Sequence, residues 1–223
     1  MKRLAIGIDE VGRGALAGPV VLAAVTISGR ISWRHPALGR IRDSKKLTPR
    51  RREAWFLHLT KHPALEWRVS RVTPRVIDRI NIARAANLAA HRLVKRLSTN
   101  NESRTNIRIV RRGSPQVRIF AKDSPFVDEP RYFVFLDGGL KLPASLPHRT
   151  ITKGDERLPI IAAASIMAKV WRDRLMTRRS VEFPAYGFHI HKGYGTRAHR
   201  RAIRRHGPSA IHRRSFLKWL AND

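Results

Sequence analysis

Hydrophobic residues alternate with small residues at the start of the chain. Leu4, Ile6 and Ile8 lie at every second position, and this spacing predicts a strand with one buried face. A second run, rich in β-branched residues, predicts another strand at residues 19–27. The glycine-rich stretch between the two runs predicts a loop that joins neighbouring strands.

Helix and strand patterns then follow one another along the chain. Thr48 and Pro49 combine a capping residue with a proline in the first turn, which predicts a helix that ends near Lys61. Residues 65–72 predict a strand, and a second Thr-Pro pair at Thr73 predicts the start of the next helix.

Two longer helices are expected further along. Residues 82–97 carry an apolar stripe at spacings of three or four, which is typical of a helix face packed on a core. The stripe consists of Ile82, Ala86, Ala89, Leu93 and Leu97. Residues 132–136 predict a buried strand, and residues 160–173, after Pro159, predict a helix rich in small residues. Strands mixed with flanking helices indicate an α/β fold.

Residues 98–131 differ from the segments on either side. Two short apolar runs, at residues 107–110 and 117–120, flank the basic stretch at residues 111–115, and this pattern predicts a basic hairpin. We expect one domain over residues 1–223, with the hairpin as an insertion that adds positive charge to its surface.

Composition narrows the class of protein. Lys and Arg number 46 against 16 Asp and Glu, and the formal net charge of +30 favours a polyanionic partner whose phosphates dominate binding. The absence of cysteine excludes disulfides and thiolate metal sites, and it suits a reducing cytoplasm. No signal peptide is visible, and no apolar run approaches the about 20 residues of a membrane span. We therefore expect a cytoplasmic monomer with no membrane partner.

Carboxylates lie at the ends of the predicted strands. Asp9 and Glu10 close the first strand, Asp137 follows residues 132–136, and Asp155 precedes the small-residue helix. Because neighbouring strand residues point to opposite faces, Asp9 and Glu10 reach one metal ion only if the chain bends there or if Glu10 contributes its backbone carbonyl. We expect a bend. A lone Asp-Glu pair is more often an ordinary polar strand end, so the weight of the prediction rests on the other carboxylates.

Six blocks of sequence resemble bacterial ribonuclease HII, and they occur in the same order. They are residues 9–19 (DEVGRGALAGP), 43–47 (DSKKL), 137–138 (DG), 153–155 (KGD), 163–170 (AASIMAKV) and 191–196 (HKGYGT). The resemblance covers nearly the whole chain, including the tail at residues 211–216, and fails only between about residues 98 and 131. It implies the ribonuclease H-like fold, a central mixed β-sheet flanked by helices, with a helical C-terminal extension.

The resemblance also implies a reaction and a ligand set. Asp9, Glu10, Asp137 and Asp155 would be the catalytic metal ligands, with Asp9 bridging two ions. Hard oxygen ligands suit Mg²⁺ or Mn²⁺, and two such ions about 4 Å apart would activate water and stabilise the leaving oxygen. The implied substrates are the RNA strand of RNA–DNA hybrids and single ribonucleotides embedded in duplex DNA, which would be cut on their 5′ side to leave 3′-hydroxyl and 5′-phosphate ends.

The expected substrate-binding residues lie outside this ligand set. A 2′-hydroxyl distinguishes RNA from DNA at a single nucleotide, and glycine lets backbone groups approach a sugar closely while an arginine holds a phosphate. The resemblance implies that Tyr194 packs on the sugar at an RNA–DNA junction and that two lysines contact phosphate. The full set is Gly12, Arg13, Gly14, Lys45, Lys46, Ser165, Lys169 and Tyr194.

Other acidic and histidine residues compete for these roles. Asp173 lies four residues after Lys169 on a helix, and this spacing favours an ion pair over metal binding. Asp43 is better placed to shape the turn that holds the two lysines, and Glu156 is the third competitor. His189 and His191 make a poor zinc site without cysteine or a second histidine pair, so hydrogen-bonding roles are favoured.

Two other functions remain open at this point. Ribonuclease HIII shares the ligand set, but its family tends to carry Gly-Lys-Gly where this chain has Gly12–Gly14, and an N-terminal domain for which we expect no room before Asp9. A non-catalytic nucleic-acid-binding protein would suit the charge alone. Carboxylates at strand ends tell against it, because they repel phosphate unless a metal lies between them.

Overall fold

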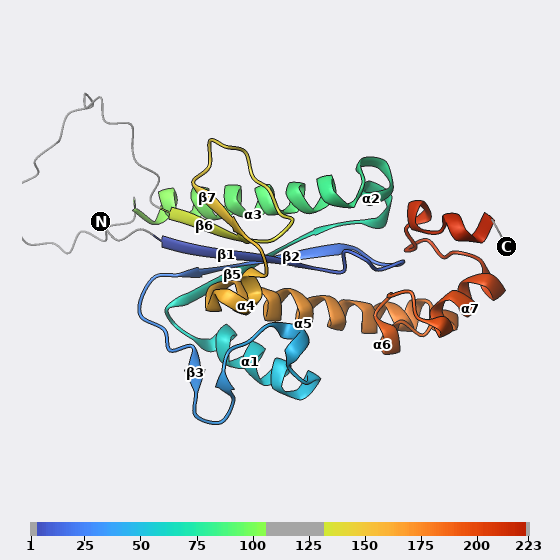
Figure 1. Ribbon diagram of the computed structural model, residues 1–223, viewed down its shortest axis with the longest axis horizontal. Helices are drawn as coiled ribbons and strands as arrows, with labels where there is room; N and C mark the ends of the chain where they lie inside the picture. The colour runs from blue at the N-terminus through green and yellow to red at the C-terminus, as the bar shows by residue number, and fades with distance from the viewer. Residues whose placement is uncertain (1–3, 106–131, 222–223) are drawn as a thin grey trace, which may run out of the picture.

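A five-stranded mixed β-sheet forms the centre of the computed structural model, which describes residues 4–105 and 132–221 (Figure 1). The strand order is β5-β2-β1-β6-β7. The strands are β1 (Leu4–Val11), β2 (Val20–Ile27), β5 (Leu65–Val72), β6 (Tyr132–Asp137) and β7 (His148–Ile151). A separate two-stranded ribbon consists of β3 (Arg34–His35) and β4 (Gly39–Arg40).

Strand direction brings the ends of β1 and β6 to one edge of the sheet. β1 pairs with β2 antiparallel as far as Val11↔Val21, whereas it pairs with β6 parallel only as far as Ile8↔Leu136. The carboxyl ends of two neighbouring parallel strands therefore lie side by side, which is where ligands bind in open α/β sheets.

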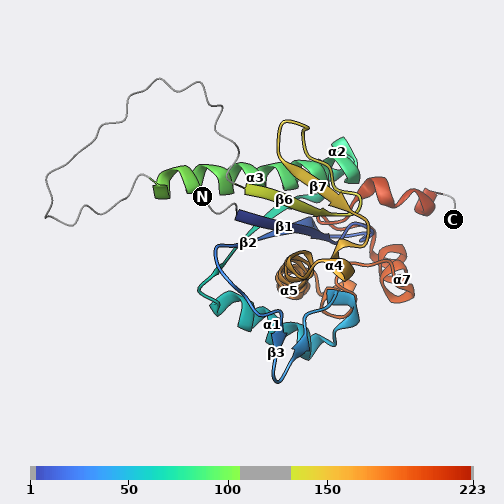
Figure 2. The same ribbon diagram turned by 60° about the vertical axis from the view of Figure 1, so that its left-hand side comes forward.

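Helices cover both faces of the sheet, as Figures 1 and 2 show. The long helix α3 (Ile82–Thr105) packs on β2 and β5, and the long helix α5 (Pro159–Glu182) packs on β1 and β2 from the opposite face. The helix α1 (Pro49–Lys61) lies on the outer side of α5. Because α5 is enclosed by the sheet and α1, it is buried almost all round through its alanine-rich first half.

Glycine allows α5 to lie close to the central strand. A Cβ atom added at Gly7 would lie 2.6 Å from the backbone oxygen of Ile160, so any larger residue would push α5 away from β1. The start of α5 is thereby placed beneath the strand that carries the first two carboxylates.

The predicted helices and strands are present, but α3 and α5 run eight and nine residues beyond their predicted ends at residues 97 and 173. Thr48 caps α1 by accepting a hydrogen bond from Arg51 N, and the apolar stripe of α3 lies in the core with only Ile82 partly exposed. α3 runs to Thr105 rather than Leu97. The predicted helix ends with the apolar stripe. A helix that has already formed extends into polar residues at little cost in free energy, because each added residue gains one backbone hydrogen bond. The predicted hairpin at residues 107–120 lies outside the described residues.

The remaining elements either join the strands and long helices of the core or form the C-terminal extension. They are η1 (Ser44–Lys46), α2 (Pro74–Ile80), α4 (Gly154–Arg157), η2 (Pro184–Tyr186), α6 (Phe188–His191), α7 (Arg197–His206), η3 (Arg214–Phe216) and η4 (Lys218–Ala221). Asp78 of α2 accepts hydrogen bonds from the backbone N–H groups of Arg214 and Ser215, and this contact attaches the extension to the α3 side of the sheet. No helix in the described part of the chain is long and apolar enough to cross a membrane.

Candidate active site

Three carboxylates converge at the ends of β1 and β6. Each of Asp9, Glu10 and Asp137 offers an oxygen atom, and these atoms all lie within 4.8 Å of one another. The first two residues come from β1 and the third from the last position of its parallel neighbour. Three of the four predicted metal ligands are thus brought together by sheet topology.

Glu10 reaches this cluster while β1 is still paired with β2, through Glu10↔Leu22 and Val11↔Val21. The pairing of β1 with β6 has already ended at Ile8, so Asp9 and Glu10 lie beyond the last pair between these two strands. Both residues nevertheless bring a carboxylate oxygen within 4.8 Å of one from Asp137. The bend that we expect at Asp9 and Glu10 stays a prediction.

Burial and mutual repulsion make the cluster electrostatically unfavourable without a cation. Asp9 is only 4% exposed, and burial, followed by the charges of Glu10 and Asp137, raises its pKa well above the ordinary value of 3.8. A hydrogen bond from Ser165 opposes that rise. Burial also raises the pKa of Glu10, although Arg13 lowers it in part.

Glu10 has one carboxylate oxygen without a partner. Its Oε1 atom accepts a hydrogen bond from Arg13 Nη1 at 2.8 Å, whereas its Oε2 atom is buried and has no hydrogen-bond partner among the described residues. An orphaned buried carboxylate oxygen is costly. Together with two neighbouring carboxylates, it provides the hard, negatively charged donor set that Mg²⁺ and Mn²⁺ prefer, so the residues present fit a divalent cation.

Asp155 lies next to the cluster but outside the converging group of three. Its neighbour Gly154 donates a backbone hydrogen bond to Asp137 Oδ1 at 2.7 Å. The Asp155 carboxylate lies 3.6 Å from Lys45 Nζ, and burial, then the charges of Asp43 and Asp137, raise its pKa. Asp155 is therefore close enough to Asp137 to respond to its charge, while its nearest ionic partner is Lys45.

The predicted lysine pair belongs to η1, beside Asp155. Asp43 accepts a hydrogen bond from Lys45 N at 2.9 Å, which confirms that it shapes this turn. Burial lowers the pKa of Lys45, but the surrounding carboxylates outweigh it and the net shift is upward. Lys46 pairs with Glu156 at 3.0 Å, so Glu156 is an ion-pair partner rather than part of the converging cluster.

The glycine-rich turn after β1 faces the same edge. Gly12 has a φ of +85°, and a Cβ atom there would lie 2.2 Å from Arg172 Nε, so both backbone conformation and space require glycine. Gly14 has no atom within 4 Å of its added Cβ and borders open space. The Arg13 side chain turns back toward the carboxylates, bonding Glu10 and lying 3.4 Å from the Gly139 carbonyl oxygen.

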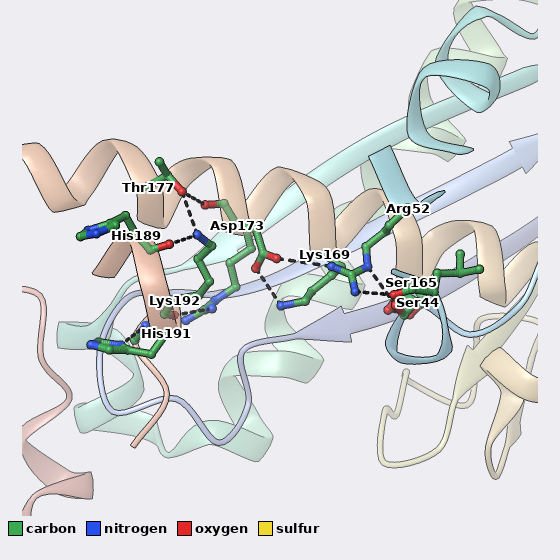
Figure 3. Close-up of polar contacts among 12 residues, drawn as sticks. Ser44, Arg52, Ser165, Lys169, Asp173, Thr177, His189, His191 and Lys192 are labelled. Atoms are coloured by element: carbon green, nitrogen blue, oxygen red, sulfur yellow. Dashed lines mark hydrogen bonds and ion pairs between the residues drawn. The ribbon is translucent and has the colours of Figure 1, made fainter. Parts of the chain in front are cut away.

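A row of polar side chains runs along α5 from Ser165 to Thr177, as Figure 3 shows. Ser165 is buried and its hydroxyl lies 2.8 Å from that of Ser44. Lys169 Nζ donates to Asp173 Oδ1 at 2.8 Å, and Arg52 lies 3.7 Å from the other oxygen of the same carboxylate. Asp173 is thus an ion-pair partner, as its spacing predicts.

Tyr194 is placed by the segment after α6. It forms an isolated β-bridge with Ala15, which sets the tyrosine beside the glycine-rich turn. Lys169 Nζ lies over the tyrosine ring, 5.7 Å from its centre. His191, a rejected zinc ligand, hydrogen-bonds the Tyr186 carbonyl and Gly193 N instead. His189 bonds Ser180. Both histidines have the hydrogen-bonding roles that the sequence favours.

The sequence interpretation missed two buried arginines beneath the turn. Arg172 and Arg213 are both 0% exposed. A signal for Arg172 existed, because it lies four residues after Ala168 and four before Met176 on the buried face of α5. Arg213 lies among other basic residues in the tail, where nothing in the pattern separates it from solvated charges.

Comparison with known proteins supports the family resemblance that the sequence motifs indicate, and it does so along almost the whole chain. The family model described as ribonuclease HII matches residues 6–130 and 137–219. Curated relatives named ribonuclease HII include one from Oleidesulfovibrio alaskensis, 41% identical over 95% of this chain and 78% of its own length. Another, from Syntrophotalea carbinolica, is 38% identical over 94% of this chain and 83% of its own length.

Solved structures share the fold. The ribonuclease HII chain in a complex with PCNA from Archaeoglobus fulgidus superposes with a TM-score of 0.68 at 24% identity, covering 98% of this chain and 95% of that one. Bst ribonuclease HIII, solved in complex with Mn²⁺, superposes with a TM-score of 0.56 at 18% identity, covering 100% of this chain and 71% of that one. The ribonuclease H-like α/β architecture predicted from sequence is confirmed.

Proposed function

Because this chain belongs to the ribonuclease HII family, we propose that Asp9, Glu10 and Asp137, with Asp155 beside them, form its catalytic metal site. Membership makes the protein a metal-dependent endoribonuclease that cleaves RNA in RNA–DNA hybrids. The observation that carries the assignment of the site is the convergence of three carboxylates, one of which, Glu10, has a buried oxygen with no hydrogen-bond partner in the described part of the chain.

Mg²⁺ or Mn²⁺ is the proposed cofactor. The proposal is supported by the all-carboxylate donor set and by the structurally similar ribonuclease HIII that was solved with Mn²⁺. A divalent cation in such a site supplies a more acidic water and neutralises charge on the phosphodiester. The carboxylates themselves would hold the metal ions, and Asp9, the most buried of the three, is the proposed ligand shared between two ions.

Positive side chains around the cluster account for phosphate binding. Lys45 keeps its charge, since the neighbouring carboxylates raise its pKa, and its side chain is 78% exposed. Lys46 is also exposed. We place the scissile strand between these lysines and the α5 row that contains Lys169, so that a phosphate meets cations on both sides of the carboxylates.

Recognition of a ribonucleotide is assigned to the turn at Gly12–Gly14 and to Tyr194. The open space at Gly14 admits a sugar close to the backbone, where amide and carbonyl groups are able to hydrogen-bond a 2′-hydroxyl. The bridge from Ala15 to Tyr194 sets a flat ring next to that space. On this basis the enzyme also incises DNA duplexes 5′ of a single embedded ribonucleotide, leaving 3′-hydroxyl and 5′-phosphate ends. We further propose that it acts as a cytoplasmic monomer.

Duplexes of defined composition test this function. A DNA duplex with one ribonucleotide and an RNA–DNA hybrid are incubated with the protein in Mg²⁺, in Mn²⁺ and in EDTA, and the ends are analysed on a sequencing gel. We expect cleavage of both with either metal and none in EDTA. An intact single-ribonucleotide duplex under every metal condition contradicts the junction assignment, and an intact hybrid contradicts the assignment of the active site.

A further inference from the structure

The glycine-rich turn is held from beneath by Arg172 of α5 and Arg213 of the tail between α7 and η3. These two residues are the arginines among the fully buried side chains of the described part of the chain. None of the ion pairs among the described residues involves either guanidinium. Their charges are instead directed at backbone carbonyl oxygens.

Arg213 holds the turn itself. Its guanidinium donates to the carbonyl oxygens of Gly12 at 2.6 Å, Arg13 at 2.8 Å and Gly18 at 2.9 Å. The first two oxygens belong to the Gly-Arg-Gly turn. A residue 200 positions away in the chain therefore sets the direction of two of its peptide groups.

Arg172 connects the turn to Tyr194. It donates to the carbonyl oxygens of Ala17 and Pro19, both at 3.0 Å, and to that of Lys192 at 2.9 Å. Its guanidinium carbon lies 5.3 Å from the centre of the Tyr194 ring. Arg172 also packs against Gly12, where an added Cβ atom would lie 2.2 Å from its Nε atom, so one side chain contacts both elements to which we assign ribonucleotide recognition.

Backbone hydrogen bonds complete the same assembly. Leu16 N and Ala17 N donate to the Gly193 carbonyl at 2.9 and 3.2 Å, and Arg213 N donates to the Leu16 carbonyl at 2.8 Å. The loop after β1 is consequently enclosed between the Tyr194 segment and the tail. Removing one guanidinium leaves these backbone bonds in place, so the loop is expected to persist with altered peptide orientation.

Burying two guanidinium groups in this way is costly, because burial lowers the pKa of Arg213 to about 9 and a buried charge without a counter-ion loses its hydration. Apolar residues of similar volume often stabilise a protein as well as or better than a buried charge. A guanidinium differs from these apolar residues, and from lysine, because its planar arrangement of N–H donors fixes several acceptors at once. The arrangement favours a positioning role over a contribution to stability.

We propose that Arg172 and Arg213 are positioning residues that determine how well the enzyme selects a single embedded ribonucleotide. They do so by setting the Gly12–Gly14 peptide groups at a defined place relative to Tyr194. This inference rests on the proposed function. A single ribonucleotide offers one 2′-hydroxyl to the turn, whereas a hybrid offers several, so misplacement affects the first substrate most.

The test uses Arg213→Lys and Arg172→Lys, which keep a positive charge and lose the fork. Initial rates are measured in Mg²⁺ on a single-ribonucleotide duplex and on an RNA–DNA hybrid of the same sequence. We expect kcat on the single ribonucleotide to fall at least tenfold, with KM within about twofold because phosphate contacts remain. The loss on the hybrid should be threefold or less.

Arg52→Lys is the matched control. Arg52, which lies beside Ser44 in Figure 3, also donates to two carbonyls, those of Ser44 and Leu47, but these belong to the turn that holds Lys45 and Lys46. The same chemical change should lower activity on both substrates in equal proportion. Thermal melting by circular dichroism establishes that each variant is folded.

Three outcomes overturn the inference. Folded Lys variants whose ratio of activities on the two substrates equals that of the wild type leave the arginines a structural role alone. If neither Lys variant folds, the ratio is measured on Arg213→Gln, which retains two donors without the charge, and an unchanged ratio there has the same meaning. A wild type that cleaves neither substrate overturns the proposed function and this inference with it, whereas active wild type beside an unchanged ratio overturns the inference alone.

Discussion

The acidic cluster and the arginine pair lie on either side of the Gly12–Gly14 turn. Their buried charges differ in how far hydrogen bonds from the protein satisfy them. Asp9, Glu10 and Asp137 place carboxylates together, and within residues 4–105 and 132–221 Glu10 Oε2 has no hydrogen-bond partner. Arg172 and Arg213 donate every one of their guanidinium nitrogens to a carbonyl oxygen.

This difference distinguishes the acidic cluster, which we propose as a ligand site, from the arginine pair, which holds other groups in place. A buried polar group without a partner in the protein indicates that its partner comes from outside, because its desolvation is otherwise uncompensated. A buried guanidinium whose three nitrogens each donate to a carbonyl oxygen of the protein holds its neighbours in place. The Gly12–Gly14 turn thus lies between the acidic cluster, to which we assign catalysis, and the arginine pair, to which we assign positioning.

Removing one carboxylate from the cluster should have the largest effect. Asp9→Asn or Asp137→Asn is expected to lower the cleavage rate by a factor of about 10² to 10³, which corresponds to several kcal/mol of lost transition-state stabilisation. Binding of the duplex in EDTA should be unchanged or tighter, since a charge that repels phosphate is gone. Single-turnover rates and fluorescence anisotropy measure the two quantities.

Glu182→Gln is the control for charge removal at a distance. Glu182 is exposed and pairs with Arg179 at the end of α5, so its activity should stay within about twofold of wild type because surface pairs contribute little. Wild-type turnover in Asp9→Asn or Asp137→Asn would remove that residue from the metal site.

Groups in both regions should make the free energy of unfolding depend on pH, and their contributions should have opposite signs. Beside the arginine pair, burial lowers the pKa values of His199 and His212 to about 4, from 6.5. Between pH 6.5 and 4 the unfolded chain binds protons that the folded chain does not, so these histidines make stability fall as pH falls, by at most about 1.4 kcal/mol per unit each. Asp9 acts in reverse, because its raised pKa makes the folded state lose stability as pH rises above 3.8.

Asp9→Asn separates these two contributions. In metal-free buffer it should be more stable than wild type near neutral pH and should show a steeper rise of unfolding free energy between pH 4.5 and 6.5, because the opposing carboxylate is absent. Urea unfolding at several pH values measures the slope. An equal or shallower slope in the variant contradicts the assigned direction of the Asp9 shift.

Side chains at the turn should have a smaller, substrate-dependent effect. Arg13→Ala and Tyr194→Ala are expected to lower activity on a single embedded ribonucleotide by about tenfold, or 1.4 kcal/mol, and less on a hybrid, where neighbouring contacts compensate. Initial rates on the two substrates give the ratio. Equal losses on both would make these two residues general binding groups.

Metal binding should stabilise the folded protein modestly. At a free Mg²⁺ concentration ten times the dissociation constant, the gain is about 1.4 kcal/mol, and thermal melting should rise by a few degrees for a chain of this size. Asp137→Asn should lose most of this increase. The same increase in the variant would indicate that the stabilising ion binds elsewhere on the protein.

Much of the fold was visible in the sequence because local patterns determine local structure. The alternation in β1, the Thr48–Pro49 start of α1 and the stripe of α3 each depend on periodicity that tertiary contacts only reinforce. The end of α3 was misplaced because a polar helical turn leaves no apolar signal. Asp173 was assigned correctly because its partner Lys169 lies within the same helix.

What the sequence determined by itself is the set of elements, the family and the residue types available for chemistry. Only the tertiary structure decided how these residues meet. Parallel pairing of β1 with β6 ends at Ile8, and beyond that pair Asp9 and Glu10 come together with Asp137. The contact of Arg213 with Gly12 spans 201 positions in the chain, and no local periodicity records a contact at such separation. Local spacing encodes which face a side chain occupies, whereas packing of distant segments determines which charges are left for a ligand.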